Sequence, residues 1–346
     1  MRFVEVTKCK NGDILAEDLF NKYGAIIVAK YTVLNSYIIC KLNELGIQQV
    51  RIFDDKEKSG YLDESRKYKR AKKTYAGCIS DIRSVVSDLA AGRPLDADKI
   101  IDISDRLCCE IRDSYVILKV LNEEKNFDEY TYTHSLNVAF YAMLAGKWLN
   151  LDADSIRTVI KAGLLHDIGK MKIPAEILNK KARLSEEEFE EIKKHTLYGY
   201  SMVKDTDRFS EEICQAVLLH HERIDKSGYP LGIGCEEIDI FSKILAVADV
   251  YDAMTSDRVY KKRDTPFRAF EMFKTEGVNG FDPLIVNVFL NNVSVCYVGS
   301  KVFLNTGETG EIAYIPPQSI TDPVVRIGQE YIDLAHDSSR NILCMV

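Results

Sequence analysis

Residues 164–170 read LLHDIGK, a stretch that places His166 and Asp167 side by side after an apolar run. Apolar residues before this pair recur at helical spacing, so we expect a helix over residues 154–170 that ends at Gly169 and Lys170. Neighbouring side chains on a helix project about 100° apart, close enough for a histidine and an aspartate to hold one metal ion or to bridge two. The alternative is a lone buried histidine paired with its neighbour, and this stretch alone leaves both interpretations open.

Length, composition and charge limit the class of protein. The chain has 346 residues, a length that predicts two or three domains. Its hydrophobic fraction of 46% is ordinary for globular proteins and sufficient for a sizeable core. Its nine cysteines include no CxxC pair, which favours a reducing cytoplasm over a disulfide framework. No run approaches the roughly 18 apolar residues of a membrane span, and the net charge of −7 argues against non-specific nucleic-acid binding. We therefore expect a cytoplasmic protein that binds neither a membrane nor a nucleic acid polymer.

The sequence falls into four segments. Residues 1–55 combine short apolar runs with one helical pattern, which predicts a small α/β module whose role, in sensing, dimerisation or packing, stays open. Residues 56–125 begin with a charged stretch, typical of a solvated helix face or a linker, and continue with two predicted helices that are compatible with a homodimer contact. Residues 126–290 show successive helical patterns, and residues 291–346 are rich in Val, Tyr, Phe and turn residues, which predicts a small β-rich module. The predicted fold class is mainly α, with a helical bundle core, a small mixed N-terminal module and a small C-terminal β module.

Seven side chains of the type that binds metals lie in the helical segment 126–290. They are His134, His166, Asp167, His195, His220, His221 and Asp249. Each lies on or at the end of an apolar helix face, where an unpartnered polar group costs about 1–3 kcal/mol. Any one of them alone could be an ordinary core histidine, but five successive helices with this pattern predict a shared partner. Imidazole and carboxylate together suit Fe, Mn, Zn or Co, and seven ligands are enough for two ions with Asp167 as the bridge.

The demands of the chemistry favour a phosphate ester as the substrate. Phosphate-ester hydrolysis is among the slowest uncatalysed reactions, and a general base alone accelerates a reaction only about 10²–10⁴-fold. Two metal ions can lower the pKa of a shared water from about 15.7 towards about 7 and hold a phosphate at the same time. Lys170 and a basic cluster at residues 258–263 supply positive charge in an acidic protein. This combination favours an anionic phosphoester over an amide.

Three motifs resemble the HD-GYP subgroup of the HD phosphohydrolase superfamily. They are HDIGK at residues 166–170, HHE followed by GYP at residues 220–222 and 228–230, and ADVYDAMTSDRVY at residues 248–260. The resemblance covers roughly residues 125–290. It implies an all-helical HD-type domain with two or three metal ions, often Fe or Mn. It also implies hydrolysis of cyclic di-GMP or, in some members, of cyclic GMP-AMP.

The resemblance also implies roles for single residues. The seven side chains above become the metal ligands, Asp167 holds a metal-bridging hydroxide that attacks phosphorus, and Lys170 holds the scissile phosphate. Other residues bind or shape the substrate site: Gly228, Tyr229 and Pro230 in the substrate loop, and Arg258 and Lys261 at phosphate or guanine. The product is linear pGpG, and further cleavage to GMP stays open.

Two departures from the family pattern bear on these expectations. Members with a third metal ion carry a Glu one turn before the first His, where this chain has Tyr130, and Glu129 falls on a different face, so we expect two divalent ions. Many members have Gly at the position of Lys226, and a lysine restricts a turn that needs positive φ. A slower loop or a changed substrate preference is the expected consequence. A sensor that binds the messenger without cutting it, and a hydrolase of another nucleotide such as cyclic GMP-AMP, therefore remain as alternatives.

Overall fold

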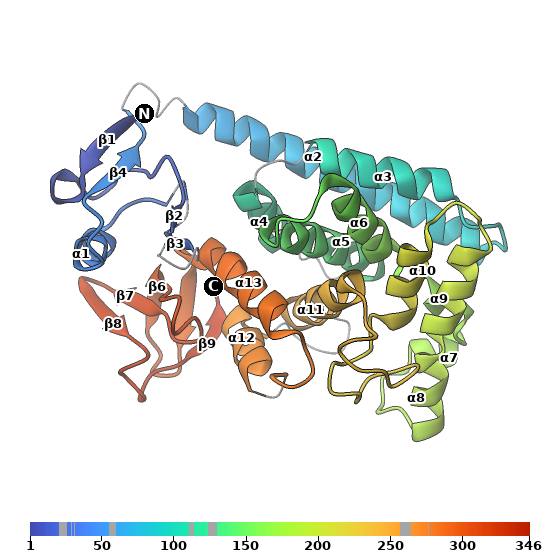
Figure 1. Ribbon diagram of the computed structural model, residues 1–346. Helices are drawn as coiled ribbons and strands as arrows, with labels where there is room; N and C mark the ends of the chain where they lie inside the picture. Colours follow the sequence, from blue (N-terminus) through green and yellow to red (C-terminus); the bar gives the residue numbers. More distant parts are fainter. Residues whose placement is uncertain are drawn as a thin grey trace. The chain divides into compact units, whose positions relative to one another are not determined.

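The computed structural model describes residues 1–20, 26–28, 30, 32–54, 60–110, 114–123, 130–256, 264–275 and 277–346 (Figure 1). The chain divides into two compact units. One unit comprises Met1–Lys67, Asp264–Glu271 and Leu290–Val346, and the other comprises Tyr68–Arg263 and Met272–Phe289. We call them the mixed unit and the helical unit. Among the described residues, no helix combines the length and the apolar character that crossing a membrane requires.

The helical unit consists of helices. Their bounds are α2 (Gly60–Ala90), α3 (Ala97–Glu110), α4 (Ser114–Glu123), α5 (Tyr130–Trp148), α6 (Ala153–Leu165), η3 (Ile168–Lys172), α7 (Ala175–Leu178), α8 (Glu186–Lys193), α9 (His195–Lys204), α10 (Glu211–Leu219), α11 (Ile240–Thr255), α12 (Pro266–Lys274) and α13 (Pro283–Ser294). Helices α2, α12 and α13 also have residues in the mixed unit. The predicted break near residues 92–94 is confirmed, because it lies between α2 and α3. The predicted helical character of residues 126–290 is confirmed for their described part, where the named elements are all helices.

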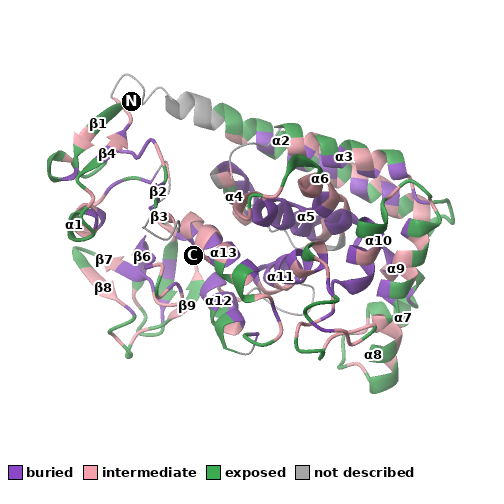
Figure 2. Cartoon of the chain, viewed as in Figure 1, coloured by how far each residue is buried: buried purple, intermediate pink, exposed green. Residues whose placement is uncertain are grey.

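Helix α5 is the centre of the helical unit. It is apolar on nearly all sides, and residues such as Leu136, Phe140 and Leu144 are fully buried (Figure 2). A helix with apolar residues all round is stable only when other helices cover it on every side. Helices α6 and α11 pack against α5, and α10 packs against both α6 and α11. This packing brings the ligand-type residues of separate helices towards one region.

Short polar motifs fix where several helices begin. The Asp152 carboxylate accepts the amides of Asp154 and Ser155 at the start of α6. The capping box predicted for Ser185 and Glu188 is present at the start of α8. Each such cap satisfies amide groups that the first helical turn leaves without a partner, typically worth about 1 kcal/mol.

The mixed unit contains the strands. Its elements are β1 (Arg2–Glu5), η1 (Val6–Lys8), β2 (Leu19–Phe20), β3 (Ile26–Val28), α1 (Ser36–Glu44), β4 (Gln49–Ile52), η4 (Val295–Tyr297), β5 (Lys301–Leu304), β6 (Thr309–Tyr314), β7 (Val324–Ile327), β8 (Glu330–Asp333) and β9 (Ile342–Met345). The last five strands form one antiparallel sheet in the order β8-β7-β6-β5-β9, so the predicted β-rich C-terminal segment is confirmed. Strands β1 and β4 pair antiparallel, as do β2 and β3.

The two ends of the chain share one core in the mixed unit. Leu15 and Val50 from the N-terminal segment belong to the same buried cluster as Tyr314 and Val324 from the C-terminal sheet. The ring of Tyr37 in α1 lies 5.8 Å from that of Tyr314, between centroids. Nothing in the local sequence pattern indicated this pairing of segments. The predicted four-part division of the chain stays a prediction.

Candidate metal centre

All seven predicted ligands lie in the helical unit, and separate elements contribute them. His134 is on α5, His166 follows α6, His195 begins α9, His220 and His221 follow α10, and Asp249 is on α11. Most of these side chains are buried, and His166, His195 and His220 are fully so. They converge on Asp167, which directly precedes η3.

The predicted helix over residues 154–170 is wrong in its last part. Helix α6 ends at Leu165, His166 is its C-cap, and a 3₁₀ turn begins at Ile168. Gly169 gives the physical reason, because a Cβ atom at this position would overlap the carbonyl oxygen of His195. The 3₁₀ turn therefore packs backbone to backbone against α9. This packing brings Asp167 Oδ1 to 3.5 Å from His195 Nε2.

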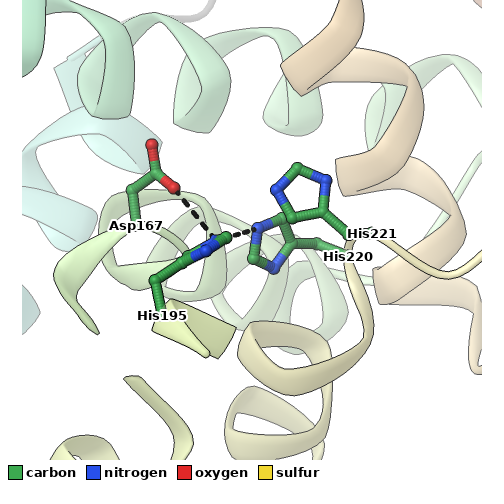
Figure 3. Close-up of side chains that lie close together, drawn as sticks. All are labelled: Asp167, His195, His220 and His221. Carbon is green, nitrogen blue, oxygen red and sulfur yellow. Dashed lines mark hydrogen bonds and ion pairs between the residues drawn. The ribbon is translucent and has the colours of Figure 1, made fainter. Parts of the chain in front are cut away.

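The ligand atoms form two groups that share one carboxylate. The first group is Asp167, His195, His220 and His221 (Figure 3), and the second is His134, His166 and Asp167. Within each group the ligand atoms all lie within 4.8 Å of one another.

The two oxygens of Asp167 face different groups. Oδ1 lies 3.5 Å from His195 Nε2, whereas Oδ2 lies 3.5 Å from His134 Nε2 and 3.4 Å from His166 Nε2. A carboxylate placed in this way can bridge two ions.

Asp249 lies beside both groups. Its Oδ1 is 3.1 Å from His134 Nε2, and its Oδ2 is 3.9 Å from His221 Nδ1. The seven side chains therefore lie close together, as the sequence analysis expected. Their role as metal ligands stays a prediction.

Two buried atoms support a metal site by having nothing else to bind. Within the described part of the chain, His166 Nε2 and Asp167 Oδ1 are buried and make no hydrogen bond. Leaving such atoms without a partner would cost about 1–3 kcal/mol each. Their neighbours stand 3.4–3.5 Å away, too far for a good hydrogen bond. Ligands bonded at about 2.1 Å to one ion are separated by about 3.0–3.4 Å, so these side chains fit a bound divalent ion.

Backbone carbonyls orient three of the imidazoles. The Nδ1 atoms of His166, His195 and His220 donate to the carbonyl oxygens three residues earlier, at 2.8, 2.7 and 2.8 Å. A carbonyl only accepts, so the proton of each neutral ring is on Nδ1 and the lone pair of Nε2 faces the centre. Metal-binding histidines are commonly fixed by such a bond from the second nitrogen.

His134 is oriented by a carboxylate instead. Its Nδ1 lies 2.8 Å from Asp252 Oδ2, and Asp252 also accepts bonds from Asn137 Nδ2 at 3.0 Å and Ser256 Oγ at 2.9 Å. Tyr75 on α2 donates to Asn137 Oδ1 at 2.7 Å, which extends the network. The sequence analysis missed Asp252, although its place three residues after Asp249 puts both on one face of α11.

The electrostatics of His220, His221 and Asp167 match what metal ligands require, whereas those of His134 do not. Burial lowers the pKa of His220 well below its ordinary value and that of His221 to about 3, so both rings are neutral. Burial also opposes the charge of Asp167, but Lys170 and the surrounding histidines outweigh it and hold its pKa well below the usual range. For His134, burial opposes protonation, but hydrogen bonds to Asp249 and Asp252 raise its pKa to about 9.

The predicted catalytic Lys170 lies at the edge of this cluster. Its Nζ is 2.6 Å from Asp167 Oδ2, and about a third of its side chain is exposed. The ammonium group therefore compensates the charge of the shared carboxylate and still reaches solvent.

The GYP loop packs directly on the metal ligands. A Cβ atom on Gly228 would overlap backbone atoms of Glu222 and Arg223, so only glycine fits there. The ring of Tyr229 lies over that of His221, with centroids 4.6 Å apart and planes inclined by 30°. These positions bring the predicted substrate loop, with Pro230, next to the first ligand group.

Glu222, whose role the sequence analysis did not assign, holds this loop. Its carboxylate is buried and accepts three backbone amides, from Leu231 at 2.6 Å, Gly232 at 3.0 Å and Ile233 at 3.2 Å. Its position directly after the two histidines in HHE could have indicated a role at the site.

The turn predicted to need positive φ has that conformation. Lys226 adopts φ +69°, where a side chain is less favourable than glycine. Its aliphatic chain lies over Gly234, whose missing side chain leaves room for it. The predicted substrate residues Arg258 and Lys261, together with Glu129, lie outside the described residues.

Comparison with known proteins gives the family context. Residues 118–285 match the model of the HD domain family. The chain is 35% identical over 244 residues to the cyclic di-GMP phosphodiesterase PA4108 of Pseudomonas aeruginosa, a match that covers 70% of this chain and 59% of the relative. It is 38% identical over 137 residues to the 3'3'-cGAMP-specific phosphodiesterase 1 of Vibrio cholerae, covering 38% of this chain and 31% of the relative. The chain thus spans less than two thirds of the length of these relatives.

A solved structure shares the fold. The chain is similar to Bd1817, an HDG"Y"P protein from Bdellovibrio bacteriovorus, with a TM-score of 0.52 and 14% sequence identity. This likeness covers 84% of the present chain and 98% of the other. At this level of identity it shows a common fold and nothing about the substrate.

Proposed function

We propose, from the match of residues 118–285 to the HD domain family, that the chain is a metal-dependent phosphodiesterase of the HD-GYP kind that hydrolyses cyclic di-GMP to linear pGpG. The observation that carries the proposal is the division of Asp167 between two groups of ligands, with one oxygen facing each group. Such a site serves phosphate-ester hydrolysis, in which attacking and leaving oxygens both need charge stabilisation.

We assign one metal ion to each group. His195, His220 and His221 would hold one ion, and His134, His166 and Asp249 would hold the other, with Asp167 common to both. Two divalent ions, Fe or Mn, would lower the pKa of a water molecule and neutralise the charge of the phosphate. The anionic Asp167 and the neutral imidazoles are already in the protonation states that metal binding requires, apart from His134.

The residues around the ions would position the substrate. Lys170 can donate to a phosphate oxygen from the exposed edge of the cluster, because its Nζ is near Asp167 and remains accessible. Tyr229 covers His221 and, with Gly228 and Pro230, would exclude water from one side of the phosphate. Arg258 and Lys261 remain proposed contacts to phosphate or guanine.

The test combines metal analysis with a product assay. We expect about two Fe or Mn ions per chain, and conversion of cyclic di-GMP to pGpG by the metal-loaded protein. A double variant, His166→Ala with Asp167→Ala, should lose metal and activity while its circular dichroism stays helical. Absence of turnover with either metal loaded, or activity that persists without metal, would contradict the proposal.

Cyclic GMP-AMP is the second candidate substrate. It is favoured by the similarity to the 3'3'-cGAMP-specific relative and by Lys226 in the loop beside the site. Parallel assays with both dinucleotides decide between them. Tight binding of cyclic di-GMP without product would instead identify a sensor. We also propose that the protein is cytoplasmic and forms a homodimer. The proposed module boundaries lie at residues 55, 125 and 290.

A further inference from the structure

An exposed aromatic side chain lies two ring contacts away from the metal ligands. Phe189 on α8 is 46% exposed, and its ring centroid is 6.5 Å from that of Tyr229, which in turn covers His221. All of α8 lies within the described residues, and none of its side chains is buried (Figure 2). Phe189 therefore does little for the core. Single exposed apolar residues are common, so the significance of Phe189 depends on its position beside the proposed centre.

A cation accompanies the two rings. Lys193 lies one helical turn after Phe189, and its Nζ is 5.0 Å from the centre of the Phe189 ring and 5.7 Å from that of Tyr229. Its ion pair with Glu190, at 2.6 Å, keeps the ammonium close to the rings. Two aromatic rings and a lysine at the edge of an anion-binding site are a combination typical of nucleotide recognition.

The charges of α8 do not prevent an anionic ligand from approaching. The helix carries five glutamates, and three of them are neutralised by ion pairs. These pairs are Lys180–Glu188 at 2.6 Å, Lys193–Glu190 at 2.6 Å and Lys194–Glu191 at 2.5 Å. Lys193 and Lys194, the partners of Glu190 and Glu191, lie at the C-terminal end of α8. At this end Lys193 also lies over the Tyr229 ring.

We propose, on the basis of the function proposed above, that Phe189, Tyr229 and Lys193 form a platform for a guanine base of the substrate. The base would stack on the exposed ring of Phe189 while its phosphate reaches the metal ligands beneath Tyr229. Lys193 would donate hydrogen bonds to O6 and N7 of guanine. Adenine presents an amino group where guanine presents O6, so the lysine disfavours adenine at this position. The platform thus assigns base selectivity to Phe189 and Lys193, which lie outside the three family motifs, together with Tyr229 of the GYP motif.

The test compares variants of the metal-loaded chain. Phe189→Ala should raise KM for cyclic di-GMP between about 5-fold and about 100-fold, the range that base stacking contributes. Its kcat should change little, because stacking is the same in the ground state and the transition state. Phe189→Tyr should restore the wild-type KM and Phe189→Leu should not. Hydrolysis of methyl 4-nitrophenyl phosphate, which has no nucleobase, should be the same in all of them.

Lys193 has a matched control in its neighbour. Lys193→Ala and Lys194→Ala each remove one charge and one ion pair from the same helix end, but only Lys193 lies over the rings. Lys193→Ala should reduce the preference for cyclic di-GMP over cyclic di-AMP about tenfold, roughly the loss of one base contact. Lys194→Ala should leave the preference unchanged.

The outcomes separate this inference from the proposed function. An enzyme that cleaves cyclic di-GMP, but whose KM is unchanged by Phe189→Ala, overturns the platform alone. Equal effects of the two lysine variants overturn the guanine contact. If the wild-type chain binds cyclic di-GMP without cutting it, Kd replaces KM in the test. The platform then requires Phe189→Ala to raise the Kd for cyclic di-GMP and Lys193→Ala to reduce the preference for cyclic di-GMP over cyclic di-AMP. A wild-type chain that neither binds nor cuts a cyclic dinucleotide overturns both proposals.

Discussion

At the scale of single residues, the site depends on how each side chain is held. Three histidines are oriented by backbone carbonyls that any sequence would supply, whereas His134 depends on the side chain of Asp252. Asp252 is fully buried, and its charge is balanced by His134 and by donated hydrogen bonds. A buried carboxylate of this kind is stable only while its partners remain. Asp252 is therefore the positioning residue most open to test.

We predict that Asp252→Asn weakens binding of one of two metal ions about 10–100-fold, the usual effect of losing a carboxylate behind a metal-binding histidine. The amide keeps the shape but removes the charge. Titration with Mn²⁺ followed by electron paramagnetic resonance measures both affinities. Asp154→Asn is the control, because the Asp154 side chain is 96% exposed. Equal affinities for wild type and Asp252→Asn would contradict the positioning role.

The raised pKa of His134 predicts that metal binding releases a proton. Its pKa of about 9 means that the ring is protonated at pH 7 in the metal-free protein, so an ion must displace that proton. Affinity should therefore rise about tenfold per pH unit from pH 7 and level off above about pH 9. His221, with a pKa of about 3, does not compete in this range. Calorimetric titration in buffers of different ionisation enthalpy counts the protons, and a count near zero at pH 7 would refute the prediction.

At the scale of elements, the close approach of η3 to α9 decides where Asp167 points. The contact is between backbones, and Gly169 makes it possible because its hydrogen leaves room for the carbonyl of His195. The loop that carries Tyr229 depends on glycine for the same reason, since Gly228 lies against the backbone of Glu222. Two of the family motifs thus contain glycines whose function is steric.

We predict opposite effects for two glycine-to-alanine changes. Gly169→Ala should destabilise the protein by about 1–3 kcal/mol and weaken metal binding, because η3 must move away from α9. Gly146→Ala in α5 should stabilise it by about 0.5–1 kcal/mol, because the added methyl group meets only ordinary contacts at 3.5–3.7 Å. Denaturant unfolding and metal titration check both variants. A Gly169→Ala protein with normal metal affinity would contradict the steric argument.

At the scale of the whole molecule, we expect metal binding and folding to be coupled in one of the two units. All seven proposed ligands lie in the helical unit, whereas the mixed unit has its own core of strand and helix residues. Binding to the folded state alone stabilises a protein by about 2.7 kcal/mol at a ligand concentration 100 times the Kd. The gain should therefore be confined to the unit that holds the ions.

Removal of the metals by a chelator should accordingly increase amide hydrogen exchange in α5, α6, α9, α10 and α11. Exchange in strands β5–β9 should stay within about twofold, which makes the mixed unit an internal control. Mass spectrometry of peptic fragments before and after chelation measures both. Uniform acceleration across the two units would contradict the coupling.

The sequence by itself determined the helical fold class, most helix positions and the set of ligand-type residues. These follow from local properties: apolar periodicity, capping residues such as Ser185, and ligand-type side chains repeated on successive apolar faces. Only the tertiary structure decided that α6 stops before His166, that Asp252 supports His134, that Phe189 lies near the ligands, and that both ends of the chain share a core. Each of these depends on contacts between residues far apart in sequence, where steric exclusion at a backbone or a buried hydrogen bond outweighs local preference.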